Sequence, residues 1–179
     1  MKSRRPHILL LCSDQQRFDT LGANGNPVCQ TPSLDRLAAE GMNFSRAFTV
    51  SSLCSPARAS LLTGLYPHNH GMTDNCNARQ VQQRELPHRL DVFPRLLQTA
   101  GYRCSYVGKW HLGHHGSFLP TKQGFDSYYG IPYSNDMVMD PSMPLAHNIL
   151  LREGVTPESI KTEKPKKNWV PLLRDEQVI

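Results

Sequence analysis

The residues with the clearest chemical potential lie in the run Leu-Cys-Ser-Pro-Ala-Arg-Ala-Ser-Leu-Leu-Thr-Gly, residues 53–64. Ser55 followed by proline is typical of a helix start, and Gly64 is typical of a helix end. Cys54 directly precedes this start, where unpaired backbone N–H groups and the positive helix end favour an anion. Arg58 lies one turn inside the helix. Taken alone, Cys54 would be interpreted as an inert buried thiol and Arg58 as half of a surface ion pair.

Two further polar groups follow segments that predict strands. Residues 7–12 are apolar on both faces, as in a buried strand, and Asp14 comes directly after them. Residues 102–107 predict a second strand, which is followed by Lys109 and His111. Because these two are separated by one residue, an extended backbone would point both side chains the same way. In α/β sheets ligands bind beyond the carboxyl ends of strands, so the pattern predicts one site there.

Helix signals alternate with these strands. Thr31 with the following proline starts a predicted helix that ends at Gly41, residues 55–64 predict another, and Asp91 caps a third that ends at Gly101. Strands alternating with helices favour an α/β fold with a largely parallel sheet flanked by helices. After Gly130 the pattern indicates loops, and the last eleven residues predict the start of another element.

Three motifs together resemble those of the formylglycine-dependent sulfatases of the arylsulfatase type. They are Cys54-x-Pro-x-Arg58 with its Leu-Thr-Gly tail, Gly108-Lys-Trp-His-Leu-Gly113, and Gln123-Gly-Phe-Asp followed by Gly130-Ile-Pro-Tyr-Ser134. The resemblance is strongest over residues 6–136, whereas 137–179 is rich in loops and is cut short, with a weaker similarity near its end. It implies an alkaline phosphatase-like α/β fold. Trp110 stands between Lys109 and His111, so on an extended backbone it would face the other way, which favours a place in the core.

The resemblance also implies a mechanism. A maturase oxidises Cys54 to formylglycine, whose aldehyde hydrate attacks sulfur with one hydroxyl and expels sulfate when the other is deprotonated. Arg58 braces the hydrate or the metal ligands, and Lys109 binds a sulfate oxygen as a fixed cation. His111 handles a proton on the hydrate, and Ser134 lies near the hydrate or the sulfate.

A metal site is implied at the end of the first predicted strand. Asp14 matches the family's first metal ligand, and the hydrate formed from Cys54 is a further ligand. Many members have two adjacent aspartates here, whereas this chain has Asp14-Gln15. The amide oxygen of Gln15 suits a hard cation, so we expect Ca²⁺, or Mg²⁺ or Mn²⁺, with the role of Gln15 left open.

Two histidine groups suggest a zinc alternative. They are His68-Asn-His70 and His111 with His114 and His115. No cysteine or carboxylate stands at a matching spacing, which favours structural or surface histidines. The five cysteines contain no Cys-x-x-Cys pair, and their odd number does not predict a closed disulfide framework.

Charge and apolar content limit the kinds of binding partner and the cellular compartment that we expect. The net charge is +5, and the densest basic stretch, residues 161–167, is interrupted and predicts a solvated loop rather than a nucleic-acid surface. No apolar run approaches the ~20 residues of a membrane helix. We expect a sulfated small molecule or glycan and a formylglycine-generating maturase as partners, with no nucleic acid and no membrane. The start lacks a signal-peptide core, which indicates the cytoplasm if it is native, although the family is often exported or lysosomal.

The second half of the family's metal ligands, with a further lysine and histidine, has no counterpart after Ser134. We therefore interpret residues 1–179 as the truncated N-terminal portion of a sulfatase catalytic domain, and expect these residues alone to cleave sulfate monoesters at or near background. Two alternatives remain open. One is a phosphonate or phosphate ester hydrolase of the same superfamily, and the other is a non-catalytic truncated remnant.

Overall fold

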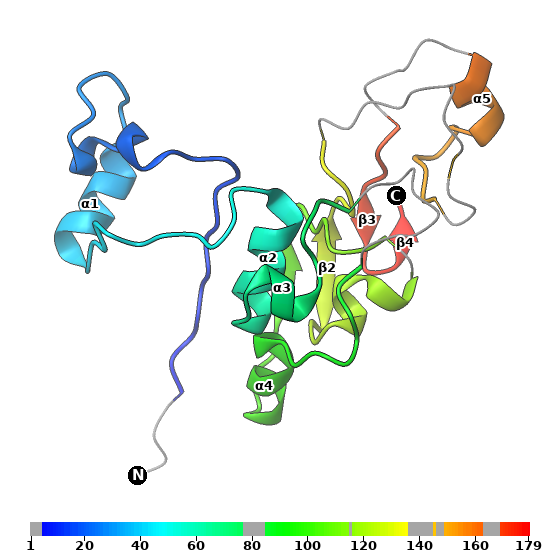
Figure 1. The fold of residues 1–179 in the computed structure, drawn as a ribbon, viewed down its shortest axis with the longest axis horizontal. Coiled ribbons are helices and arrows are strands. Elements are labelled where there is room, and N and C mark those ends of the chain that lie inside the picture. Colours follow the sequence, from blue (N-terminus) through cyan, green and yellow to red (C-terminus); the bar gives the residue numbers. More distant parts are fainter. Residues whose placement is uncertain (1–4, 77–84, 115, 136–144, 146–148, 163–168) are drawn as a thin grey trace. The chain divides into compact units, whose positions relative to one another are not determined.

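The structure is a computed structural model that describes residues 5–76, 85–114, 116–135, 145, 149–162 and 169–179 (Figure 1). The chain divides into two compact units, Met1–Phe48 and Thr49–Ile179. Of the helices in the described ranges, none combines the length and the apolar character that crossing a bilayer requires.

The first unit is built around helix α1, Pro32–Glu40, preceded by two short 3₁₀ turns at Phe18–Thr20 and Gly22–Asn24. The predicted helix between Thr31 and Gly41 is confirmed. The Thr31 hydroxyl does not cap its own helix but accepts the Gly22 N–H at 2.8 Å and donates to the Asp35 carboxylate at 2.9 Å. Thr31 therefore ties the second turn to α1.

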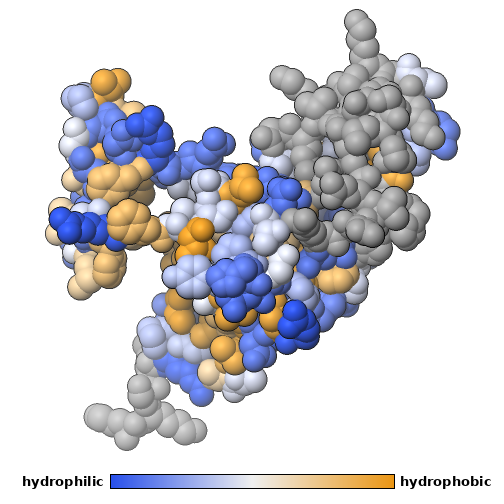
Figure 2. All heavy atoms as spheres, viewed as in Figure 1, coloured by the Kyte–Doolittle hydropathy of each residue, from blue (hydrophilic) through white to orange (hydrophobic). Residues whose placement is uncertain are grey.

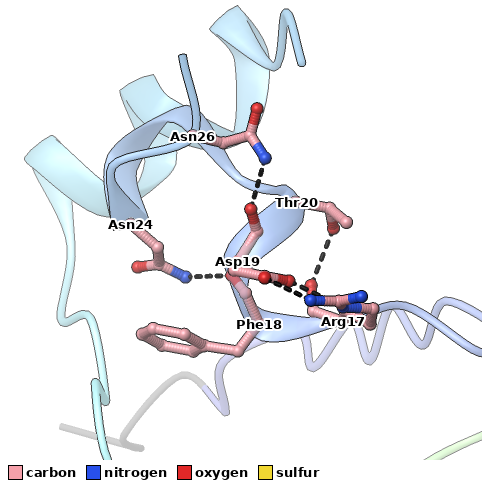
Figure 3. Close-up of polar contacts among 6 residues, drawn as sticks. All are labelled: Arg17, Phe18, Asp19, Thr20, Asn24 and Asn26. Atoms are coloured by element: carbon pink, nitrogen blue, oxygen red, sulfur yellow. Dashed lines mark hydrogen bonds and ion pairs between the residues drawn. The ribbon is translucent and has the colours of Figure 1, made fainter. Parts of the chain in front are cut away.

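The turn before α1 is held by polar side chains rather than by a core (Figure 3). Arg17 pairs with the Asp19 carboxylate, which lowers the pKa of Asp19. Asn24 donates to the Phe18 carbonyl at 2.9 Å, and Asn26 donates to the Asp19 carbonyl. Because these contacts are exposed to water, each is expected to contribute little to stability.

The predicted strand over residues 7–12 is wrong for this structure. The segment is irregular, and its four central apolar side chains are exposed, Leu9 at 80%. A strand that is apolar on both faces is stable only with neighbouring strands and a covering layer. Within the described part of the first unit there is no strand that could pair with it.

The second unit contains a four-stranded sheet in the order β1-β2-β3-β4 (Figure 1). The strands are β1 Ser105–Val107, β2 Ser127–Gly130, β3 Leu173–Arg174 and β4 Gln177–Val178. Strands β1 and β2 are parallel, and the other two pairs are antiparallel. The α/β class is confirmed. The described sheet is mixed because β3 and β4, residues 173–178, form an antiparallel hairpin. This hairpin lies within the last eleven residues, where the sequence predicted the start of another element.

The α-helices in the described part of the second unit are α2 Cys54–Thr63, α3 Pro67–His70, α4 Phe93–Thr99 and α5 Pro157–Thr162. Helices α2 and α4 lie where the sequence predicted them, and α2 ends at Gly64, whose φ of +70° favours glycine. Their starts differ from the prediction: Leu53 and Val92 stand at the cap positions instead of Ser55 and Asp91. Helix α2 therefore begins at Cys54 itself.

The core lies in the second unit. Trp110 is fully buried, as predicted, and its ring meets those of Tyr106 and Phe125 edge-on. A smaller apolar cluster surrounds Tyr133 and Trp169. The first unit has no buried residue among those described, and most of its large apolar side chains, such as Phe48, are exposed. Figure 2 shows apolar residues on the surface of this unit.

Candidate active site

Cys54 occupies the first position of helix α2 and is half-buried. The Lys109 ammonium lies 3.2 Å from the Cys54 sulfur. The next backbone N–H, that of Ser55, donates to the Asn75 amide oxygen at 2.9 Å. The start of α2 thus presents the Cys54 side chain beside a cation, an arrangement that favours negative charge.

Arg58 lies one turn further along α2 and is anchored at the backbone of Lys109. Its guanidinium donates to the Lys109 carbonyl at 2.7 Å and to the Tyr106 hydroxyl at 3.2 Å. The Tyr106 hydroxyl donates to the same carbonyl at 2.6 Å. Two donors on one carbonyl oxygen fix the backbone from which the Lys109 side chain extends.

The segment carrying Lys109 continues the parallel pairing of β1 with β2. The N–H groups of Gly108, Trp110 and His111 donate to the carbonyls of residues 129, 131 and 132 at 2.9, 2.9 and 3.1 Å. A Cβ atom on Gly130 would overlap the Gly108 carbonyl, so glycine allows the two backbones to approach. The predicted placement of these residues beyond a strand end is confirmed.

His111 does not continue the extended backbone. Its φ is +57°, in the left-handed region, and its side chain is 2% exposed. The ring Nε2 lies 3.0 Å from the Cys76 carbonyl oxygen. The prediction assumed that an extended strand runs through both Lys109 and His111. That assumption is wrong, because the strand geometry ends before His111.

Ser55 joins these segments, although the sequence marked it only as a helix cap. Its hydroxyl donates to the His111 carbonyl at 2.6 Å and accepts the Cys76 N–H at 3.0 Å. Ser55 is fully buried, and burial raises the pKa of the Cys76 thiol to about 12. Cys76 thus contributes backbone groups to the site while its thiol stays neutral.

Of the other predicted residues, Ser134 is buried, 5% exposed, in the segment after β2. Asp14 and Gln15 lie in the first unit, where both are exposed and Gln15 has a φ of +46°. The structure brings Cys54, Arg58, Lys109 and His111 together through direct contacts or shared partners. The placement of Asp14 and Gln15 beside them stays a prediction.

The contacts that sequence reasoning missed come from Asn75, Tyr106 and the backbone of Cys76. Only Tyr106 had a signal, because it stands in the predicted strand just before Lys109. Asn75 lies in the loop after α3, and no spacing rule connects it to Ser55. Such residues are found only when the fold is known.

The histidines support the structural interpretation. His70 is fully buried: its Nδ1 accepts the Met72 N–H at 3.1 Å and its Nε2 lies 2.9 Å from the Ser60 hydroxyl. Burial lowers the pKa of His70, which keeps its ring neutral. His114 is buried against the Tyr133 ring, and His115 lies outside the described residues. Within the described ranges, no three His, Cys, Asp or Glu side chains gather as a zinc site would require.

Comparison with known proteins gives a consistent family. A family model described as Sulfatase matches residues 6–173. Arylsulfatase G of Rattus norvegicus is 45% identical over 136 residues, which cover 76% of this chain and 26% of that protein. N-acetylgalactosamine-6-sulfatase of Mus musculus is 45% identical over 133 residues, which cover 71% and 26%. The chain thus spans about a quarter of the length of these relatives.

Solved structures show the same similarity. The structure of Ps i-CgsB has a TM-score of 0.72 and 28% identity, covering 93% of this chain and 35% of that one. BT4656, in complex with its substrate D-glucosamine-2-N,6-O-disulfate, has a TM-score of 0.60 and 33% identity, covering 72% and 24%. The phosphonate monoester hydrolase of Agrobacterium radiobacter has a TM-score of 0.51 and 38% identity, covering 58% and 19%.

Proposed function

The chain belongs to the sulfatase family and has its alkaline phosphatase-like α/β fold, and we propose that the protein hydrolyses sulfate monoesters with a formylglycine made from Cys54. The contact between the Lys109 ammonium and the Cys54 sulfur, 3.2 Å at the start of α2, carries this proposal. It joins the two main motifs of the chain, 55 residues apart, at one point.

The position of Cys54 suits the modified residue. Once a maturase has replaced the thiol by an aldehyde, its hydrate supplies one hydroxyl to attack sulfur and another to expel sulfate. The helix start and Lys109 provide positive potential for the anionic ester at that position. Both are in place before substrate binds, which lowers the reorganisation needed during the reaction.

Lys109 and Arg58 have different electrostatic roles in this proposal. The Lys109 ammonium, which lies beside residue 54, would bind a sulfate oxygen. Arg58 is held by the Lys109 carbonyl and by Tyr106, so its charge stays near the reacting group without having to move. A held guanidinium is an effective partner for developing negative charge because its orientation is already fixed.

His111 would move the proton. Its buried ring is held at Nε2 by the Cys76 carbonyl, and its backbone is linked through Ser55 to the residue after Cys54. Ser134, which is buried after β2, would support the hydrate or the sulfate by hydrogen bonding. Imidazole is suited to this task because its unperturbed pKa lies near neutrality.

The donor chemistry of Asp14 and Gln15 fits a hard divalent cation. One carboxylate and one amide oxygen, with a hydrate oxygen from residue 54, match the oxygen ligands that Ca²⁺ or Mg²⁺ prefers. When bound, the cation would stabilise negative charge on the hydrate and on the sulfate. The neutral Gln15 amide makes this donor set less negative than a pair of aspartates.

The substrate class follows from the relatives. Two of the matched proteins are named for glycan sulfates or were solved with a sulfated sugar: N-acetylgalactosamine-6-sulfatase and the complex with D-glucosamine-2-N,6-O-disulfate. A sulfated sugar or a small aryl sulfate is therefore the substrate class we propose. A formylglycine-generating maturase is the partner that the chemistry at Cys54 requires.

A second function within the same superfamily is phosphonate monoester hydrolysis. The specific observation in its favour is the 38% identity to the phosphonate monoester hydrolase, although that match covers only 58% of this chain. Sulfate and phosphonate esters are both tetrahedral anions, and the same cation and helix start would bind either.

The test compares paired substrates. The protein, in the longest form that its gene encodes, is co-expressed with an active maturase and assayed with 4-nitrophenyl sulfate and with a 4-nitrophenyl phosphonate monoester, with Cys54→Ala as the control. We expect a higher kcat/KM for the sulfate and background rates in the control. A preference for the phosphonate would favour the second function, and background rates for both esters with a converted Cys54 would favour the non-catalytic alternative.

A further inference from the structure

Three contacts around Ser55 close a ring of hydrogen bonds that joins three distant parts of the second unit. The Ser55 hydroxyl donates to the His111 carbonyl at 2.6 Å and accepts the Cys76 N–H at 3.0 Å. The third side joins the His111 Nε2 to the Cys76 carbonyl at 3.0 Å. All three residues are buried, with exposures of 0%, 2% and 6%.

The third contact decides which ring nitrogen of His111 carries hydrogen. A backbone carbonyl can only accept, so the His111 Nε2 must be the donor. In the neutral ring, the lone pair that can take a proton is then on Nδ1. The Cys76 carbonyl thus selects one tautomer, provided that it stays where it is.

Ser55 holds both ends of that contact. Its hydroxyl donates to the His111 carbonyl and accepts the N–H of Cys76. The Cys76 carbonyl in turn contacts the His111 ring. His111 also depends on such support because its φ of +57° is unfavourable for a residue with a Cβ atom and persists only where neighbours hold it. The Pro132 carbonyl, 3.1 Å from the His111 N–H, is the other backbone restraint.

We propose that Ser55 is a positioning residue. Its hydroxyl fixes the position of His111 relative to the Cys76 carbonyl, so that His111 exchanges its proton through Nδ1. This rests on the proposed function, in which His111 handles the proton on the hydrate of residue 54. Because Ser55 directly follows residue 54, the same hydroxyl also couples the start of α2 to the base.

The test uses Ser55→Ala in protein whose conversion at residue 54 is measured by mass spectrometry. The control is Ser60→Ala, on the same helix, whose hydroxyl contacts His70 instead. One readout is kcat and KM for 4-nitrophenyl sulfate per converted site. The other is the ¹⁵N spectrum of selectively labelled histidine, in which His111→Gln identifies the His111 signals.

We expect a single neutral tautomer of His111, protonated at Nε2, in the parent protein and in Ser60→Ala. Ser55→Ala should lower kcat by about 10–100-fold, as loss of a supporting hydrogen bond typically does, with KM changed less than about twofold. Its His111 signals should show mixed tautomers. If kcat falls while the tautomer is unchanged, Ser55 is merely structural and the proposal is overturned.

A kcat within about twofold of Ser60→Ala would also overturn the proposal, whatever the tautomer. The two hypotheses fail separately. If the converted parent protein hydrolyses no sulfate ester, the proposed function fails. The ¹⁵N spectra then decide the role of Ser55 alone, because they need no turnover: an Nε2-protonated ring that is unchanged in Ser55→Ala would still contradict it.

Discussion

The start of α2 and the Asp14-Gln15 segment are both predicted parts of one site, yet they differ in how the chain holds them. At the start of α2, Cys54 and Arg58 contact the segment after β1 at 3.2 and 2.7 Å. Asp14 and Gln15 lie in a unit with no buried residue among those described. Catalytic groups need a rigid support, and the second unit provides it through its own core.

The second unit holds its proposed catalytic residues by contacts within itself. Lys109 is fixed because its neighbours pair with the segment after β2 and because Trp110 anchors the turn in the core. The proposed sulfate-binding cation is therefore held by contacts within its own unit. Asp14 lies in a unit that has no buried residue among those described.

The largest expected effect is on catalysis in the second unit. Lys109→Ala removes the cation beside residue 54, and we expect kcat to fall about 10²–10³-fold, as for loss of one preorganised oxyanion contact. The measurement is kcat for 4-nitrophenyl sulfate. Lys122→Ala is the matched control, since Lys122 is exposed and pairs with Glu176 at 2.6 Å. Equal rates in the two variants would contradict the role of Lys109.

Substitutions of apolar residues test whether the two units differ in their contribution to the free energy of unfolding. Leu112 is fully buried, so Leu112→Ala should lower the free energy of unfolding by about 2–5 kcal/mol. Leu37 of α1 is 56% exposed, and Leu37→Ala should cost less than about 0.5 kcal/mol. Urea unfolding measures both. A cost at Leu37 comparable with that at Leu112 would show that α1 is packed in the protein and would break the comparison.

Metal affinity tests the Asp14-Gln15 segment. In protein stripped with a chelator and titrated with Ca²⁺, Asp14→Ala should weaken affinity by more than about tenfold, because it removes a charged oxygen ligand. Gln15→Ala should have a smaller effect, since only a neutral oxygen is lost. Calorimetry gives both dissociation constants. Unchanged affinity in Asp14→Ala would remove this segment from the site.

A modest effect on stability is expected at Thr31, the residue before α1. Thr31→Val keeps the shape but removes the hydroxyl that links Gly22 to Asp35, at a cost of about 1 kcal/mol. Thermal unfolding measures the loss, with Thr20→Val as a control, because the Thr20 hydroxyl donates to the exposed Arg17 carbonyl. Equal losses in the two variants would mean that the Thr31 bridge adds nothing to the first unit.

Local signals in the sequence predicted much of the second unit. Ser55 with the following proline and Gly64 located α2, and Asp91 with Gly101 located α4, each to within a few residues. The position of Lys109 after a predicted strand correctly indicated that it belongs to the site. The wrong prediction over residues 7–12 arose because an apolar run is also compatible with an unpaired segment. The left-handed backbone of His111 and the bridge through Ser55 depend on long-range packing, which no local pattern encodes.

The central claim is that Cys54 becomes the reacting group, and the mass of the peptide containing it tests this most directly. After co-expression with a formylglycine-generating maturase of proven activity, the Cys54 peptide should lose its thiol and carry an aldehyde that reacts with a hydrazine. Lys109→Ala serves as a comparison, because it should retain the converted residue while losing turnover. A Cys54 thiol that remains fully open to alkylation under these conditions would contradict the account.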